Sequence, residues 1–492
     1  MLKKIKQKYD NFPQTVRASF WFLVCGFIQR GISLLTTPIF SRLLSTSEYG
    51  DFNVYNSWHN IIIIFASLNL ASGVYMRGLV KYEDDRDKFS GSLQILYLVT
   101  TSITLAIYLI FHNWWNSLFG LTSPFVYTIF IDIIVQTAYH FWSAEQRVEF
   151  QYRKLVFFTL LNAFLRPTIG IICVLLFPNN RLEARIYSMV AVDVLTFAIF
   201  FLRIFRNGVK TLTAKYWKYA LAFNLPLVPH YLSQIVLNQS DRIMIKKMVG
   251  SSESGIYSLA YSAAAILTIV NTALINTLTP WMYKKMKAEE YKEIGVKSIP
   301  ILIFIAFINF ALVSFAPEAI AILAPASYYD AIWIIPPVTT STFFIFMYSL
   351  FANFEFYFDK TKYMMIASVL GAATNLGLNY IFINIFGYYA AGYTTLVCYL
   401  LYCIGHYLLM RRINNKMMGG IKVYNLKLII LISLSFVGMC AVMMLFYNSF
   451  IPRIIIFSVI CGFAIWKRNL FLDRIREMRK VKKEVKNKKE EN

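Results

Sequence analysis

Long apolar runs without charged residues recur from one end of this 492-residue chain to the other. A helix of about 20 such residues crosses the roughly 30 Å hydrocarbon core of a membrane. Only 15% of the residues are charged, whereas about a quarter is usual in soluble chains. The sequence therefore predicts an all-α polytopic membrane protein.

Charged or Pro-, Gly- and Asn-rich breaks divide the sequence into about fourteen expected transmembrane helices. These spans begin near Ala18, Phe52, Phe89, Pro124, Leu155, Arg185, Tyr219, Ser254, Ser298, Ala331, Tyr363, Tyr388, Asn425 and Ile451. An even number of spans places both termini on the same side of the membrane.

The distribution of Lys and Arg tests this count, because short cytoplasmic loops are rich in basic residues. Forty of the 49 basic residues lie in alternate segments, which are 1–17, 77–88, 146–154, 203–218, 282–297, 359–363, 411–427 and 467–492. We expect this side, with the N-terminus 1–17 and the basic tail 467–492, to be cytoplasmic. The net charge of +23 is explained by these loops, so no nucleic acid is expected as a partner.

Two short segments match at a fixed offset of 205 residues, Arg42-Leu-Leu-Ser-Thr-Ser-Glu-Tyr-Gly50 and Lys247-Met-Val-Gly-Ser-Ser-Glu-Ser-Gly255. Helix starts alone would explain the small polar residues and the Glu. The two segments lie six spans apart, however, which favours a parallel repeat of transporter type. We expect an N-terminal lobe over 18–205, a C-terminal lobe over 206–410 and two further helices over 411–466.

Two arginines fall in the middle of expected spans, Arg30 in the first and Arg166 in the fifth. A charge at this depth is costly and faces protein or water. A guanidinium presents donors that suit phosphate oxygens, so both arginines are candidates for binding an anionic substrate. The alternative is an ion pair within the lobe with Asp132 and Asp193, which lie at comparable depth.

Four further charged residues and two prolines are candidates for coupling and gating. Glu355 and Asp359 flank the inner end of the tenth span. They either respond to protons or cations or face water at the interface, and the sequence favours the water-facing position. Asp241 and Arg242, at the end of span seven, either clamp a gate or form a local pair, which is favoured. Pro226 and Pro229 each kink or break span seven, as expected of a hinge.

Nothing in the sequence indicates an enzyme, a cofactor or a metal site. Every loop is short, and no P-loop glycine motif accompanies a Lys and a Ser or Thr. The six cysteines all fall inside apolar spans and are typical of small buried residues.

Three stretches resemble the Wzx-type polysaccharide flippases, an oligosaccharide flippase family with a MATE-like fold in the multidrug/oligosaccharidyl-lipid/polysaccharide exporter superfamily. The first is Thr37-Pro-Ile-Phe-Ser-Arg-Leu-Leu-Ser-Thr-Ser-Glu-Tyr-Gly50. The second comprises Leu225-Pro-Leu-Val-Pro-His230, Ser240-Asp-Arg-Ile-Met-Ile245 and Gly255-Ile-Tyr-Ser258. The third joins Asn375-Leu-Gly-Leu-Asn379 to Gly387-Tyr-Tyr-Ala-Ala-Gly392, where the glycine follows the alanines instead of preceding them.

This resemblance implies a flippase of the bacterial cytoplasmic membrane. Its substrate would be a polyprenyl-diphosphate-linked oligosaccharide, moved to the outer leaflet by alternating access for capsule, O-antigen or exopolysaccharide synthesis. Partners would be membrane lipids, a polysaccharide polymerase and a chain-length regulator. A multidrug exporter of the MATE branch and a flippase for the peptidoglycan lipid precursor remain alternatives, because a fold does not determine the substrate.

Overall fold

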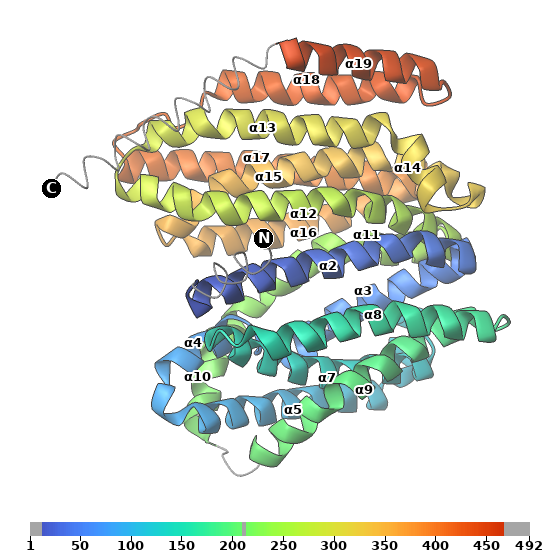
Figure 1. Ribbon diagram of the computed structural model, residues 1–492, viewed down its shortest axis with the longest axis vertical. Helices are drawn as coiled ribbons and strands as arrows, with labels where there is room; N and C mark the ends of the chain where they lie inside the picture. The colour runs from blue at the N-terminus through green and yellow to red at the C-terminus, as the bar shows by residue number, and fades with distance from the viewer. Residues whose placement is uncertain (1–11, 209–212, 467–492) are drawn as a thin grey trace, which may run out of the picture.

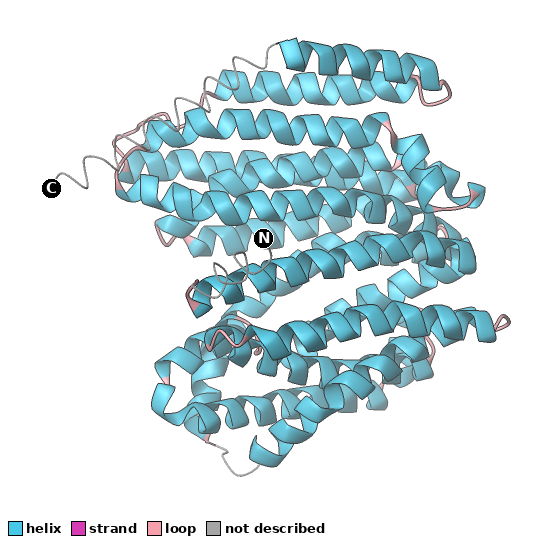
Figure 2. Ribbon diagram, viewed as in Figure 1, coloured by secondary structure: helices cyan, strands magenta, loops and turns pink. Residues whose placement is uncertain are grey.

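The computed structural model describes residues 12–208 and 213–466, and every regular element in these ranges is a helix (Figures 1 and 2). Part of the expected N-terminal segment and the whole basic tail lie outside the described residues. In a membrane, helices satisfy their own backbone hydrogen bonds. The all-α architecture expected from the sequence is confirmed.

The first half of the chain forms one helical bundle, the lower one in Figure 1. Its helices are α2 (Gln14–Leu43), α3 (Thr46–Ser67), α4 (Gly73–Lys81), α5 (Arg86–Ile110), α6 (His112–Phe119), α7 (Ser123–Val148), α8 (Tyr152–Leu176) and α9 (Arg181–Gly208), with the 3-10 turn η1 (Glu83–Asp85).

The second half forms the upper bundle in Figure 1, and α18 and α19 lie at its outer edge. Its elements are α10 (Ala214–Asn224), η2 (Leu225–Leu227), α11 (Val228–Met248), α12 (Ser251–Lys287), α13 (Tyr291–Ser314), α14 (Ala316–Leu323), η3 (Ala326–Trp333), α15 (Ile335–Tyr357), α16 (Thr361–Phe386), α17 (Tyr389–Met417), α18 (Leu426–Leu445) and α19 (Phe450–Trp466). Helix α10 departs from this division, because it packs against α4 and α5 of the first bundle.

Each of the fourteen expected spans corresponds to a helix, although not all of them are equally apolar. Eleven helices in the described part are long and apolar enough to cross a membrane, or twelve if α6 and α7, which meet at 90°, form one span. Helix α19 is apolar but shorter. The remaining expected span, α3, is not apolar enough to be counted among these helices.

Helix α3 is polar because protein, not lipid, surrounds much of it. It carries Asn53, Asn56, His59 and Asn60 within two turns, and it packs against α11 and α12 of the other bundle. A membrane helix buried by other helices can carry such groups, since they hydrogen-bond to protein or water. Its polar composition is therefore consistent with a position between the two bundles.

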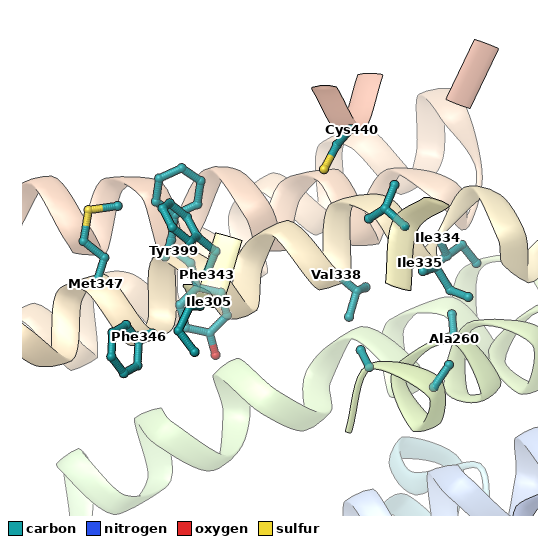
Figure 3. Packing of buried hydrophobic residues seen from close by; sticks show 14 of the residues in the cluster. Ala260, Ile305, Ile334, Ile335, Val338, Phe343, Phe346, Met347, Tyr399 and Cys440 are labelled. Carbon is teal, nitrogen blue, oxygen red and sulfur yellow. The ribbon is translucent and has the colours of Figure 1, made fainter. Parts of the chain in front are cut away.

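Apolar cores fill both bundles, and the larger core extends across their interface to Phe40, Tyr49 and Val174 of the lower bundle. The upper bundle has one extended core, and Figure 3 shows Ala260 of α12, Ile305 of α13, Val338 of α15 and Tyr399 of α17 within it. The lower bundle has two smaller cores, one of which includes Tyr216 and Ala220 of α10. The chain thus leaves the first bundle at the end of α10, where η2 interrupts the helix.

One end of the molecule carries the basic loops 77–88, 146–154, 282–297 and 411–427 and is called the basic end. The other end, whose loops carry few basic residues, is called the opposite end. The two bundles meet near the opposite end. At the opposite end Ser251 Oγ donates to Asp51 Oδ1 at 2.6 Å, and Ser252 Oγ donates to Thr46 Oγ1 at 2.7 Å. Lys246 Nζ lies 2.8 Å from Asp51 Oδ1. These contacts close the space between the bundles at the opposite end.

Candidate functional site

Two buried carboxylates lie at the centre of the first bundle. Asp132 of α7 and Asp193 of α9 are 1% and 0% exposed. The amide of Gln136 joins them, because its Nε2 donates to Asp132 Oδ2 at 2.8 Å and to Asp193 Oδ2 at 3.1 Å. The two aspartates therefore belong to one polar network.

Each carboxylate in this network has a basic partner from a different helix. Arg166 Nη2 lies 3.0 Å from Asp193 Oδ2, and His59 Nε2 lies 3.1 Å from Asp132 Oδ2. Asn162 also donates to Asp193 Oδ1 at 2.6 Å. Arg166 thus forms an ion pair within the lobe, as the alternative from the sequence allows, whereas Asp132 pairs with a histidine that the sequence did not single out.

Arg30 lies apart from this network. It is exposed in the middle of α2, and no ion pair or hydrogen bond of its side chain is found within residues 12–208 and 213–466. An unpaired arginine at membrane depth is expected to face water rather than lipid. Of the two arginines expected to pair with Asp132 and Asp193, only Arg166 forms such an ion pair.

Exposed polar side chains accompany Arg30 on helices from both bundles. They occur near the middle of α2, α11 and α12, and they are Gln29, Ser33, Asn238, Thr268, Thr272 and Asn276. The three on α12 are spaced by four residues and so share one face. Asn238, Thr268 and Thr272 donate to carbonyls of their own helices. The amides of Gln29 and Asn276 and the guanidinium of Arg30 would lack partners in lipid, so the band favours a hydrated space between the bundles.

Asp241 of α11 is fully buried in the second bundle and is surrounded by neutral donors. Asn379 Nδ2 donates to its Oδ1 at 2.6 Å, Thr395 Oγ1 donates to its Oδ2 at 2.9 Å, and Tyr257 also donates to Oδ2. No basic side chain forms an ion pair with Asp241 in the described part of the chain. Such a carboxylate must be stabilised by these hydrogen bonds, by a proton or by a bound cation.

No ion pair joins Arg242 to Asp241 in the described part of the chain, in contrast to the local pair favoured by the sequence. The Arg242 guanidinium donates to Asn238 O at 2.8 Å and lies over the Tyr261 ring, 4.6 Å from the centroid. Adjacent residues of a helix point about 100° apart, which explains why Asp241 and Arg242 have different surroundings. A role of either residue in gating remains a prediction.

Glu355 is fully buried, in contrast to the water-facing position favoured by the sequence. His406 Nδ1 of α17 lies 2.7 Å from Glu355 Oε1, and both side chains are 0% exposed. Their other polar atoms, Glu355 Oε2 and His406 Nε2, have no partner. Asp359 is exposed just beyond the end of α15 and does not share this site. The structure thus separates the two carboxylates that the sequence grouped.

The prolines of span seven lie where the regular α-helix gives way to a 3-10 turn, and their role as a hinge remains a prediction. Pro226 lies within the 3-10 turn η2, and Pro229 lies in the first turn of α11. Proline lacks the N–H that an uninterrupted helix requires. The break coincides with the crossing of the chain from the first bundle to the second, which is where a hinge would act.

No group of three His, Cys, Asp or Glu side chains capable of holding a metal ion occurs in residues 12–208 and 213–466. The six cysteines are free thiols. The polar chemistry of the described residues is therefore concentrated in the aspartate network, the Asp241 cluster, the Glu355–His406 pair and the exposed polar band around Arg30.

Sequence comparison relates the chain to proteins of polysaccharide synthesis. Residues 15–286 match the family model described as "Polysaccharide biosynthesis protein". The chain is 23% identical over 364 residues to the Lsg locus putative protein 1 of Haemophilus influenzae, which covers 71% of this chain and 86% of that protein. An uncharacterised membrane protein of the same organism is 21% identical over 373 residues, covering 74% and 89%.

Solved transporters share the fold. An inward-facing multidrug resistance MATE family transporter of the MOP superfamily aligns with a TM-score of 0.65 at 13% identity, covering 79% of this chain and 96% of that one. The lipid II flippase MurJ, in an inward closed conformation, aligns with a TM-score of 0.64 at 15% identity, covering 91% and 99%. The two-bundle architecture is thus a MATE-like fold.

Proposed function

Because the chain belongs to the polysaccharide biosynthesis protein family, we propose that it is a flippase for polyprenyl-diphosphate-linked oligosaccharide repeat units. It carries them from the cytoplasmic to the outer leaflet of a bacterial inner membrane, for synthesis of a surface polysaccharide. Both termini and the basic end face the cytoplasm, in accordance with the positive-inside rule. The polymerase and the chain-length regulator that use the product are its expected partners.

The exposed polar band between the bundles is the observation that carries this proposal. Its amides and hydroxyls suit the hydroxyl groups of sugars, and the unpaired Arg30 supplies a permanent positive charge at the same depth. Arg166 contributes less free charge, since Asp193 holds it at 3.0 Å. We therefore assign the diphosphate chiefly to Arg30, and Arg166 serves the aspartate network of its own bundle.

Alternating access requires the two bundles to separate where they now touch. The polar contacts at the opposite end include two hydrogen bonds and one ion pair, which can be exchanged for water at modest cost. The apolar contact between Tyr49 and Tyr328 at the same end would also have to open. Pro226 and Pro229 supply the hinge, because the helix break η2 lies where the chain passes between the bundles.

Two buried groups in the second bundle are our candidates for ion coupling. Asp241 has only neutral partners, and Glu355 has only His406. Taking up a proton or a cation would change the net charge at either position within a medium of low dielectric constant. Asp359 is too exposed to serve in this way.

Deletion of the gene in its host, followed by complementation, tests the proposal. We expect the deletion strain to lose surface polysaccharide and to accumulate lipid-linked repeat units inside, and Arg30→Gln to restore neither. Normal polysaccharide with altered drug sensitivity would instead favour a multidrug exporter. Arrested peptidoglycan synthesis would favour a flippase for the peptidoglycan precursor.

A further inference from the structure

Helix α10 and the turn η2 line a shallow, open groove with a volume of about 720 Å³. Its lining residues are Lys218, Leu221, Ala222, Leu225 and Pro226. They are spaced by three or four residues and so share one face of the helix. The other face is occupied, because Tyr216, Ala220 and Asn224 are buried. The groove is therefore a surface that protein leaves uncovered.

The chemistry of the groove changes along its length. Lys218 lies nearer the basic end, and Leu221, Ala222, Leu225 and Pro226 follow it toward the membrane interior. Leu225 is 56% exposed although it is apolar. A positive charge at one end and apolar side chains beyond it match a single-chain lipid with an anionic headgroup.

Two further lysines flank Lys218 and are held in place by aromatic rings. Lys81 Nζ lies 4.6 Å from the centroid of Tyr219, and Lys215 Nζ lies 5.5 Å from the centroid of Tyr82. Stacking on a ring orders an ammonium group without using up its three N–H donors. The three lysines thus remain able to bind an anion.

Asp85 acts on Lys215 through its charge and not through a direct contact. In the described ranges, none of the three lysines forms an ion pair. The acidic turn η1 lies close by, but Asp85 of η1 is 2.9 Å from Lys88 Nζ and accepts a hydrogen bond from Tyr216 at 3.2 Å. Glu83 pairs with Arg86 at 3.2 Å. The nearby acids are therefore partly engaged elsewhere.

We propose that this groove is the cytoplasmic docking site of a polyprenyl-diphosphate carrier, occupied before translocation. The diphosphate is bound by Lys81, Lys215 and Lys218, and the first isoprene units lie along Leu221 to Pro226. A diphosphate carries more charge than the single phosphate of a phospholipid, which suits a site with three lysines, two of which lie near the same Tyr82 ring. A single polyprenyl chain also suits a groove formed by one helix face better than two acyl chains do.

This inference rests on the proposed function and adds a location to it. The groove ends at Pro226, within the break between α10 and α11. A bound lipid would therefore contact the proposed hinge before its headgroup reaches Arg30. Docking at the groove and transport through the polar band are separate steps, and each has its own measurement.

Binding to the full-length protein tests the inference, with farnesyl diphosphate as the probe and native mass spectrometry as the readout. Lys218→Gln should weaken binding about fivefold, which corresponds to about 1 kcal/mol. Ala222→Trp, which fills the groove from an exposed position, should abolish binding. Lys416→Gln and Ala288→Trp alter exposed residues of the second bundle away from the groove, and both should bind as the wild type does.

Three results would overturn the inference. Equal binding by all variants would place the lipid elsewhere, while leaving the flippase proposal intact. Equal competition by phosphatidylglycerol would make the groove a site for bulk lipid. No binding by the wild-type protein, combined with normal export in complemented cells, would remove the docking step without affecting the proposed function.

Discussion

Gly50 of α3 and Gly255 of α12 face each other where the two bundles cross. A Cβ atom on Gly50 would overlap the carbonyl oxygen of Ser251, and one on Gly255 would overlap that of Thr46. Thr46 and Ser251 are themselves separated by 205 residues, as are the two glycines. The contact is therefore reciprocal, as expected if an approximate two-fold axis relates the halves of the chain.

Alanine at Gly50 should push the bundles apart at the opposite end. The clash is with backbone, which cannot rotate away, so we expect a destabilisation of about 1–3 kcal/mol in thermal unfolding and wider inter-bundle distances by spin labelling. Gly26→Ala is the matched control, because nothing lies within 4 Å of a Cβ there. Equal behaviour of the two variants would show that the close crossing is unimportant.

The repeat is visible in the sequence, but the contact between its two copies is not. Matching letters at Ser47–Gly50 and Ser252–Gly255 indicate similar helix starts. They carry no information on whether the helices touch, since this depends on how the bundles pack. The glycines were the available signal, because a glycine in a helix often marks a close approach.

Asp193→Asn should destabilise the first bundle by leaving Arg166 without its carboxylate. We expect a loss of about 2 kcal/mol, between the values for exposed and buried pairs, because Arg166 is 31% exposed. Thermal unfolding of the purified protein measures this. The double variant with Arg166→Gln should recover most of the stability, whereas additive losses would contradict the pairing.

His406→Leu should leave Glu355 buried and unpaired in the second bundle. Breaking a fully buried pair in this way costs about 3–5 kcal/mol, which thermal unfolding would detect. Glu355→Gln keeps a hydrogen-bonding side chain without its charge, so we expect a smaller loss of stability but a loss of ion-dependent transport. Unchanged transport in Glu355→Gln would exclude this residue from coupling.

The ion pair between Glu318 and Arg453 should stabilise the protein only above acidic pH. Burial acts to raise the pKa of Glu318, but the hydrogen bonds from Arg453, at 2.6 and 2.7 Å, outweigh it and lower the pKa. A lowered folded-state pKa stabilises the protein above the unfolded pKa of about 4.3 and loses this effect as pH falls further.

Comparison of the wild-type protein with Glu318→Gln across pH tests this prediction. The wild-type protein should be more stable by about 1 kcal/mol at neutral pH. The difference should begin to fall at about pH 4.3 and be lost only once the pH is below the lowered folded-state pKa of Glu318. The variant should also loosen α19 from α14, because Arg453 lies in the first turn of α19 and its partner Glu318 lies in α14. A constant difference at all pH values would mean that the Glu318 charge does not contribute.

The helices, and the alternation of basic and non-basic loops between them, could be predicted because apolar runs and basic loops are local features of the sequence. Partners of buried polar residues could not, since they come from distant segments. His59 meets Asp132 across 73 residues, and Asn379 meets Asp241 across 138. Glu355 was expected to face water because it is near the end of a span, yet a histidine on another helix buries it.

Direct observation of lipid movement tests the central claim most closely. The purified protein would be reconstituted into vesicles that contain a fluorescent prenyl-diphosphate-linked disaccharide, and leaflet accessibility would be followed with a membrane-impermeant quencher. The account predicts rapid exchange between leaflets with the wild-type protein, with Arg30→Lys retaining part of it and Arg30→Gln close to protein-free vesicles. Wild-type exchange no faster than in protein-free vesicles, or exchange unaffected by Arg30→Gln, would contradict it.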